Sequence, residues 1–228
     1  MRLPVTVAAA PAAAAATAAA TLAGWMRDAV AARGQCTIAL SGGQTPWQML
    51  EALREFELPW PQVYVFQVDE RVVPFDDERR NARRIQALLV RPGALNDRQF
   101  CRMPVEDPDP ALAARAYAGA LAARCGTPPV LDIVQLGLGP DGHTASLVPG
   151  DPLLEVTDSD VGLSQAYQGT LRLSLTFPVL NRARHILWLV TGAAKAPMLR
   201  RLLAGDSTIP AGRVARERAL VIADAAAG

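Results

Sequence analysis

Short runs of apolar and β-branched residues alternate along the chain with segments of helical pattern, and this alternation limits the fold more than any other feature. Runs that are apolar throughout are typical of strands buried on both faces of a sheet. Strands that alternate with helices predict an α/β fold, with a mostly parallel sheet covered by helices on both faces. We expect strands at residues 36–40, 63–68, 131–136, 171–175, 186–190 and 219–223, and helices at residues 46–56, 79–90, 111–124 and 193–203.

The N-terminal stretch of residues 1–22 is apolar and rich in alanine, so a targeting segment has to be considered. A signal peptide has a basic start and a core of larger apolar residues, whereas Pro4 and Pro11 interrupt this stretch, which then continues into residues 24–30. Because alanine is the best helix former, we expect a first amphipathic helix here. No other apolar run approaches the ~20 residues of a membrane span.

The 228 residues suit a single α/β domain over residues 1–228. The cysteines Cys36, Cys101 and Cys125 are far apart and form no disulfide framework, which favours a reducing compartment and a cytoplasmic location. The 23 basic and 22 acidic side chains nearly cancel, which argues against a nucleic-acid partner. An anionic substrate must therefore be held by a local pocket. We expect a monomer or weak homodimer that binds no membrane.

Ligands of open parallel sheets gather at the carboxyl ends of the strands, and several polar segments of this chain lie there. The segment SGGQTP follows the predicted strand 36–40, opens a helix, and contains Ser41, Gly42, Gly43 and Thr45. Free N–H groups at a helix start can bind a phosphate. A plain turn from strand to helix is the alternative interpretation.

Three consecutive charges, Asp69, Glu70 and Arg71, follow the predicted strand 63–68. Charges at a strand end are costly unless they are solvated or paired. Asp69 is suited to accept hydrogen bonds from sugar hydroxyls, and Arg71 to bind an anion through two parallel hydrogen bonds. A solvated turn with a local ion pair is the alternative.

The loop GLGPDGHTASL, which follows the predicted strand 131–136, carries the strongest chemical signal. Its glycines permit an irregular backbone, and Asp141 and His143 share it. Histidine titrates near neutrality and serves as a general acid or base, although this one could also be satisfied by a backbone carbonyl. The other histidine, His185, stands at a strand start and is expected to be structural or exposed.

Arg172 and Lys195 are two further candidates for anion binding. Arg172 lies inside the predicted strand 171–175, where a charge needs a partner. Lys195 stands near a helix start, where it opposes the helix dipole unless an anion is bound. Each also fits an ordinary surface charge. No metal site is expected, because the two histidines are 42 residues apart and no Cys/His cluster accompanies them.

In order along the chain, the segments SGGQTP, DERVVP, LGLGPDGHTASLVPG and TGAAKA closely resemble the 6-phosphogluconolactonases, a family related to the glucosamine-6-phosphate isomerases and deaminases. The resemblance extends over nearly the whole chain, and DGHTASL is its most specific part. It implies a Rossmann-like α/β fold, no cofactor, and hydrolysis of 6-phosphogluconolactone to 6-phosphogluconate in the pentose phosphate pathway.

The resemblance also implies roles for the matching residues. Substrate, chiefly its phosphate, would be bound by Ser41, Gly42, Gly43, Thr45, Arg172 and Lys195; Asp69 and Arg71 would line the sugar pocket, and Asp141 and His143 would lie at the reacting centre. His143 would take a proton from the attacking water, with either Asp141 or Asp69 orienting the imidazole. Backbone N–H groups of the glycine loop, or Arg71, would stabilise the oxyanion.

Three positions depart from the family pattern. Asn81 lies within Arg-Asn-Ala, where Ser-Asn-Tyr is usual, Leu171 replaces a common proline, and Val148 replaces a usual phenylalanine. The deaminases typically carry a glutamate at the position of Val148, so the valine favours a lactonase. A deaminase or isomerase of amino-sugar phosphates and a non-catalytic sugar-phosphate sensor are the competing interpretations. The sensor is disfavoured because His143 is present and no basic helix for DNA binding is found.

Overall fold

A seven-stranded parallel sheet forms the centre of the computed structural model, which describes residues 3–228; Met1 and Arg2, at the start of the apolar N-terminal stretch, lie outside the described residues. The strand order is β1-β10-β9-β6-β2-β3-β5, and every neighbouring pair is parallel. The bounds are Val5–Ala8 (β1), Cys36–Leu40 (β2), Val63–Gln67 (β3), Phe100–Cys101 (β5), Ile133–Leu136 (β6), His185–Val190 (β9) and Ala219–Asp224 (β10).

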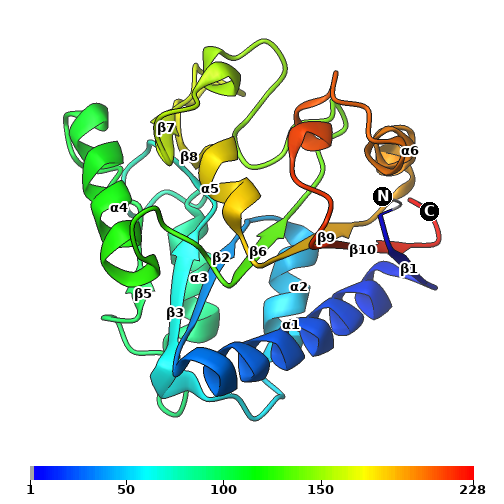
Figure 1. Ribbon diagram of the computed structural model, residues 1–228, viewed down its shortest axis with the longest axis horizontal. Helices are drawn as coiled ribbons and strands as arrows, with labels where there is room; N and C mark the ends of the chain where they lie inside the picture. Colours follow the sequence, from blue (N-terminus) through cyan, green and yellow to red (C-terminus); the bar gives the residue numbers. More distant parts are fainter. Residues whose placement is uncertain (1–2) are drawn as a thin grey trace.

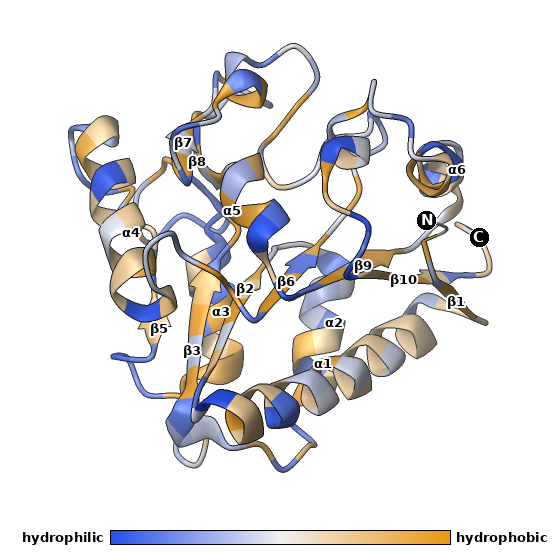
Figure 2. Ribbon diagram, viewed as in Figure 1, coloured by the Kyte–Doolittle hydropathy of each residue, from blue (hydrophilic) through white to orange (hydrophobic). Residues whose placement is uncertain are grey.

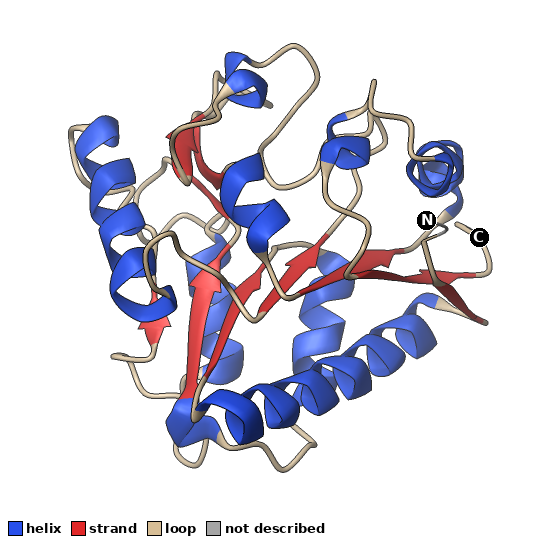
Figure 3. Ribbon diagram, in the orientation of Figure 1, coloured by secondary structure: helices blue, strands red, loops and turns tan. Residues whose placement is uncertain are grey.

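Helices cover both faces of this sheet (Figures 1 and 3). The helices of one face are α1 (Pro11–Arg33), α2 (Gln44–Leu53) and α3 (Asn81–Leu89), and those of the other are α4 (Pro110–Cys125), α5 (Phe177–Arg182) and α6 (Ala196–Ala204). Strand residues alternate between the two cores: Trp188 of β9 packs on the α4–α6 face, and its neighbours Leu187 and Leu189 pack on the α1–α3 face. The α/β class and the two-sided helical cover predicted from the sequence are confirmed.

A second, antiparallel sheet was not expected from the sequence. Its order is β4-β8-β7, with β4 at Asp69–Arg71, β8 at Arg172–Leu175 and β7 at Val161–Leu163. The strand predicted at 171–175 is therefore real, but it lies outside the parallel sheet. The charged triplet, which was expected to follow the end of a strand, is itself the strand β4.

The N-terminal helix is confirmed as α1, and it buries one face with small side chains, among them Ala14, Ala18 and Leu22. Its polar and apolar faces differ little in hydropathy (Figure 2), so the expected amphipathic contrast is weak. The preceding strand β1 was missed because its four residues lie within the alanine-rich stretch. No helix among residues 3–228 combines the length and the apolar character that crossing a membrane requires.

The remaining helical elements are short 3-10 turns: η1 (Trp60–Gln62), η2 (Pro152–Glu155), η3 (Ala193–Lys195) and η4 (Pro210–Arg213). The helix predicted at 193–203 is thus divided into η3 and α6. The region of residues 149–168, which shows no clear helical or strand pattern in the sequence, contains η2 and the strand β7. Its C-terminal end reaches the polar residues described next, through the contact of Tyr167 with Asp141.

Candidate active site

Polar segments meet at the carboxyl edge of the parallel sheet, where the strand order reverses. From β2 the chain passes to β3 on one side, and β6 lies on the other side of β2. Such a reversal opens a crevice between neighbouring strands, which is where ligands of open α/β sheets bind. Ser41 follows β2 and Gly137 follows β6, so both border this crevice.

The loop after β6 folds tightly around the imidazole of His143. The Gly139 N–H donates to the His143 carbonyl over 2.8 Å, and the Gly142 N–H donates to the Gly139 carbonyl over 3.1 Å. A Cβ on Gly139 would lie 2.1 Å from His143 Nδ1 and 2.6 Å from Asp141 Oδ1. Position 139 therefore has to be glycine for the ring and the carboxylate to lie where they do.

Asp141 is the carboxylate that contacts the imidazole. Its Oδ1 lies 2.6 Å from His143 Nδ1 and also accepts the His143 backbone N–H over 3.1 Å. Partial burial alone would raise the pKa of Asp141, but the hydrogen bonds from His143 and the charge of its ring outweigh burial and lower that pKa. Asp69, the other candidate, is engaged elsewhere, since its Oδ2 accepts the Ser146 hydroxyl over 2.6 Å.

Tyr167, which was not recognised from the sequence, contacts both the His143–Asp141 pair and the guanidinium of Arg172. Its hydroxyl donates to Asp141 Oδ2 over 3.2 Å, and its ring packs edge-on against His143 with 5.3 Å between centroids. The Arg172 guanidinium lies 5.1 Å from the centre of the same ring. No motif in the sequence marks this tyrosine, because its contacts depend on how the 149–168 region folds back.

Two arginines face each other across the small sheet. Arg71 of β4 pairs in register with Arg172 of β8. The Arg71 Nη1 donates to Asn81 Oδ1 over 2.6 Å, whereas the Nε of Arg172 is buried without a hydrogen-bond partner among the described residues. Burial lowers the pKa of Arg172, since desolvation outweighs the attraction of Asp69. Like charges directly opposite each other are destabilising unless an anion lies between them.

Lys195 brings a third cation to the site from the other side, through the turn after β9. It forms the last residue of η3 and the N-cap of α6, as the sequence suggested. Partial burial lowers the pKa of its ammonium group, although Asp141 acts in the opposite direction.

The SGGQTP segment contributes backbone more than side chains. The Ser41 hydroxyl donates to the Gln135 carbonyl over 2.8 Å, and Thr45 shares a 2.6 Å hydrogen bond with Thr191. The N–H groups of Gly42 and Gly43 donate to no other residue within 3–228. They lie at the start of α2, so they remain available to an anion.

These elements enclose one cavity of about 190 Å³. Its lining comprises Ser41, Gly42, Asp69, Arg71, Asn81, Gly137, Leu138, Gly139, His143, Ala145, Arg172 and Lys195. Seven of the ten residues singled out from the sequence are therefore brought together. Gly43, Thr45 and Asp141 do not line the cavity, and Asp141 instead contacts His143. Asn81, noted in the sequence only as part of an unusual motif, was missed as a lining residue.

His185 lies apart from this cavity and packs as a structural residue. Its ring stacks on Trp25 with 4.7 Å between centroids, and burial lowers its pKa from 6.5. Among residues 3–228, no three His, Cys, Asp or Glu side chains are grouped so as to hold a metal ion.

Comparison with known proteins gives consistent matches over most of the chain. A sequence model of the family described as glucosamine-6-phosphate isomerases/6-phosphogluconolactonase matches residues 9–222. The chain is 39% identical over 183 residues to a 6-phosphogluconolactonase of Synechocystis, covering 78% of this chain and 76% of that protein. It is 35% identical over 217 residues to the 6-phosphogluconolactonase of Mycobacterium tuberculosis, covering 89% and 88%. The solved 6-phosphogluconolactonase of Trypanosoma cruzi is 26% identical and superposes with a TM-score of 0.88, covering 99% of this chain and 96% of that chain.

Proposed function

The chain belongs to the family of glucosamine-6-phosphate isomerases and 6-phosphogluconolactonases, and from this premise we propose that it hydrolyses 6-phosphogluconolactone to 6-phosphogluconate with His143 as the general base. Its relatives at 35–39% identity are lactonases, which act in the pentose phosphate pathway. The observation that carries the proposal is a single cavity in which His143, held by Asp141, faces the three cations Arg71, Arg172 and Lys195.

The contact with Asp141 fixes the protonation pattern of the imidazole. An ionised carboxylate can only accept, so in the neutral form of His143 the proton is on Nδ1 and the lone pair is on Nε2. In our mechanism Nε2 removes a proton from water as the water oxygen bonds to the lactone carbonyl carbon. The C–O bond to the ring oxygen then breaks, and the same proton passes to that oxygen. General base catalysis of this kind supplies roughly 10²–10⁴-fold.

The phosphate group of the substrate accounts for the unusual arginine pair. Arg71 and Arg172 lie opposite each other, and the buried Nε of Arg172 has no partner among the described residues. A dianion between them removes the repulsion and provides the missing acceptor. Lys195 adds a third positive charge to the lining of the same cavity. Holding the phosphate fixes the distant carbonyl beside His143, which is the entropic contribution of binding to the rate.

The developing oxyanion has a restricted choice of donors. The N–H groups of Gly139, Gly142 and His143 are already used within the loop, so they are not available. Because Arg71 is assigned to the phosphate, we assign the oxyanion to the free N–H groups of Gly42 and Gly43, each such donor being worth about 3–4 kcal/mol. Asp69 accepts the Ser146 hydroxyl through Oδ2, and its Oδ1, which has no hydrogen-bond partner within residues 3–228, is left to accept from a sugar hydroxyl.

Val148 separates this chemistry from that of the amino-sugar deaminases. Its side chain is 7% exposed and does not line the cavity. An apolar, buried residue provides no group to relay a proton to His143, whereas the deaminases carry a glutamate at this position.

The decisive assay generates the lactone in place with glucose-6-phosphate dehydrogenase and follows acid release. The protein should accelerate release above the spontaneous rate, and it should release no ammonia from glucosamine 6-phosphate. Acid release at the spontaneous rate, or ammonia release, would contradict the assignment.

We further propose that the enzyme works in the cytoplasm as a monomer or weak homodimer, as one domain, without nucleic acid. The three cysteines are unpaired, in keeping with a reducing compartment. Light scattering across a range of protein concentrations measures the assembly state.

A further inference from the structure

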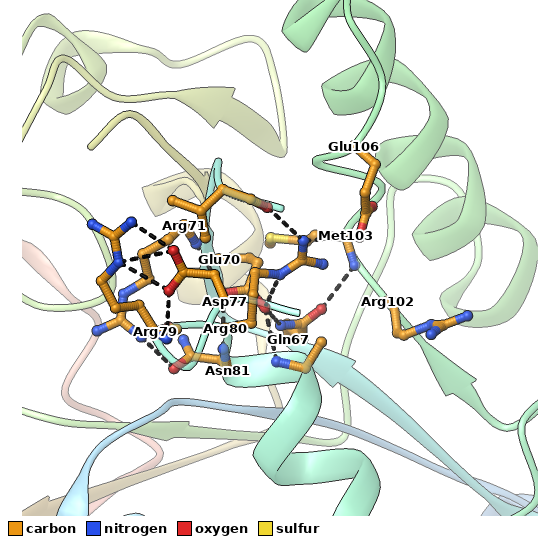
Figure 4. Close-up of polar contacts among 12 residues, drawn as sticks. Gln67, Glu70, Arg71, Asp77, Arg79, Arg80, Asn81, Arg102, Met103 and Glu106 are labelled. Carbon is orange, nitrogen blue, oxygen red and sulfur yellow. Dashed lines mark hydrogen bonds and ion pairs between the residues drawn. The ribbon is translucent and has the colours of Figure 1, made fainter. Parts of the chain in front are cut away.

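We infer that Glu70 and Arg80, a buried ion pair behind the cavity wall, position Arg71 and Asn81 for substrate binding. Neither residue of the pair lines the cavity, and the mechanism above uses neither. The inference rests on the proposed function, because it treats Arg71 as a residue that binds the phosphate. Figure 4 shows the pair and its neighbours.

Glu70 is fully buried, and its carboxylate is saturated with donors. Oε1 accepts the backbone N–H groups of Arg71 and Asn81, over 2.8 and 2.9 Å. Oε2 accepts the Gln67 side-chain amide and the Ala82 N–H, each over 2.8 Å. A carboxylate has about four acceptor positions, so the whole capacity of Glu70 is used. One side chain therefore joins the backbone of β4 to the first turn of α3.

Arg80 places its charge beside this carboxylate without bonding to it in good geometry. Its side chain is 1% exposed and its Nε lies 3.2 Å from Glu70 Oε2, yet Nε and Nη2 have no hydrogen-bond partner among the described residues. Nη1 donates to the Val73 carbonyl over 2.9 Å and lies 2.8 Å from Glu106. The desolvation penalty of a buried ion pair can exceed its Coulomb attraction unless the hydrogen bonds of both groups are satisfied, and those of Arg80 are not. Stability alone therefore does not account for the pair.

The Glu70–Arg80 pair holds the backbone of two residues that line the cavity. The two N–H groups that share Glu70 Oε1 belong to Arg71 and Asn81, whose side chains both line the cavity. These side chains also meet, since Arg71 Nη1 donates to Asn81 Oδ1 over 2.6 Å. Asn81 in turn donates to the Asp69 carbonyl over 3.0 Å and leaves no room for a Cβ on Gly42. A shift of β4 against α3 would therefore move several parts of the anion site together.

The test is Glu70→Gln, measured in the full-length protein by KM and kcat for the lactone and by the Kd of 6-phosphogluconate in calorimetry. In this variant an amide NH2 group would replace a carboxylate oxygen and would face N–H groups that now donate to Oε2. We therefore expect KM and Kd to rise about ten-fold, with kcat changed much less. The matched control is Asp132→Asn, which also removes a buried, ion-paired carboxylate, 5% exposed. Asp132 accepts from Thr37 and Arg33 at the amino ends of the parallel strands, the edge of the sheet opposite the cavity. It should lower Tm and leave KM unchanged.

A double-mutant cycle separates positioning from general loosening of the fold. If Glu70 acts through Arg71, adding Glu70→Gln to Arg71→Ala should raise KM by less than about two-fold further. Equal effects in both backgrounds, or an unchanged KM in folded Glu70→Gln, would overturn the inference. Should Glu70→Gln fail to fold, Arg80→Met keeps every hydrogen bond to Glu70 and should raise KM in the same direction, and an unchanged KM there would equally overturn it. A wild-type protein that binds 6-phosphogluconate without hydrolysing the lactone would refute the proposed function alone, because the Kd measurement still tests the pair.

Discussion

At the residue scale, the division of labour between Asp141 and His143 depends on which of them the substrate can reach. His143 lines the cavity, whereas Asp141 does not and touches the far side of the ring at Nδ1. The carboxylate therefore acts on the orientation and charge of the imidazole, not on the substrate. Tyr167 occupies the second oxygen of the same carboxylate and limits its rotation.

Replacing Asp141 with asparagine should consequently impair turnover more than binding. The amide can donate to Nδ1, which would place the proton of His143 on Nε2 and remove the base. We expect kcat to fall about 10²-fold or more, with KM little changed. Steady-state kinetics at neutral pH measures both constants, and a rise in KM at constant kcat would show that Asp141 binds substrate directly.

His185 gives a pH dependence of stability that is independent of the cavity. Burial lowers its pKa in the folded protein below the usual 6.5, so below that pH the unfolded chain binds more protons than the folded chain. The free energy of unfolding should therefore decrease as the pH falls below 6.5. His185→Phe keeps the stacking on Trp25 and removes the titration, so this variant should lose less stability between about pH 7.5 and about pH 5.5 in urea denaturation. An equal loss in both proteins would exclude His185 as the source.

At the element scale, the site depends on the small antiparallel sheet and on the loop after β6. The small sheet sets Arg71 opposite Arg172, and the loop after β6 wraps His143 closely enough that Gly139 cannot carry a side chain. Neither arrangement improves stability by itself. Both become understandable when the cavity holds an anion at one end and a reacting carbonyl at the other.

Gly139→Ala tests the loop as a unit. The added methyl would overlap His143 Nδ1 and Asp141 Oδ1, so the pair must separate, and kcat should fall by roughly 10²-fold. The far-ultraviolet circular dichroism should remain that of the wild type. Gly119→Ala in α4, where a Cβ meets nothing within 4 Å, is the control for the chemical change itself. Full activity in Gly139→Ala would mean that the ring does not work in the position observed.

At the scale of the whole molecule, ligand binding and folding stability are linked through the cations. A ligand that binds only the folded state stabilises it by about 2.7 kcal/mol at a hundred times its Kd. For a chain of this size, that raises Tm by roughly 5–10 °C. 6-Phosphogluconate should produce such a rise in the wild type and a much smaller one in Arg172→Ala. Equal rises in calorimetric scans of the two proteins would place the phosphate elsewhere.

The sequence predicted the parts of the fold and site that local pattern determines. Ser41 and His143 could be found because each follows an apolar strand of the parallel sheet, whose carboxyl ends must share one edge. The strand β4 could not, because its three residues are all charged and become a strand only by pairing with β8, about a hundred residues later. For the same reason the Arg71–Arg172 pair and the contacts of Tyr167 are absent from any local pattern. The choice between Asp141 and Asp69 likewise required the fold, since Ser146 engages Asp69.

The role of His143 as the general base is tested by comparing His143→Asn with the wild type under saturating lactone, with 6-phosphogluconate binding measured in parallel. If His143 is the general base, kcat should fall about 10²–10⁴-fold toward the spontaneous rate, while the Kd of 6-phosphogluconate should stay within about two-fold, because the cations are untouched. A folded His143→Asn protein with kcat close to that of the wild type would contradict it.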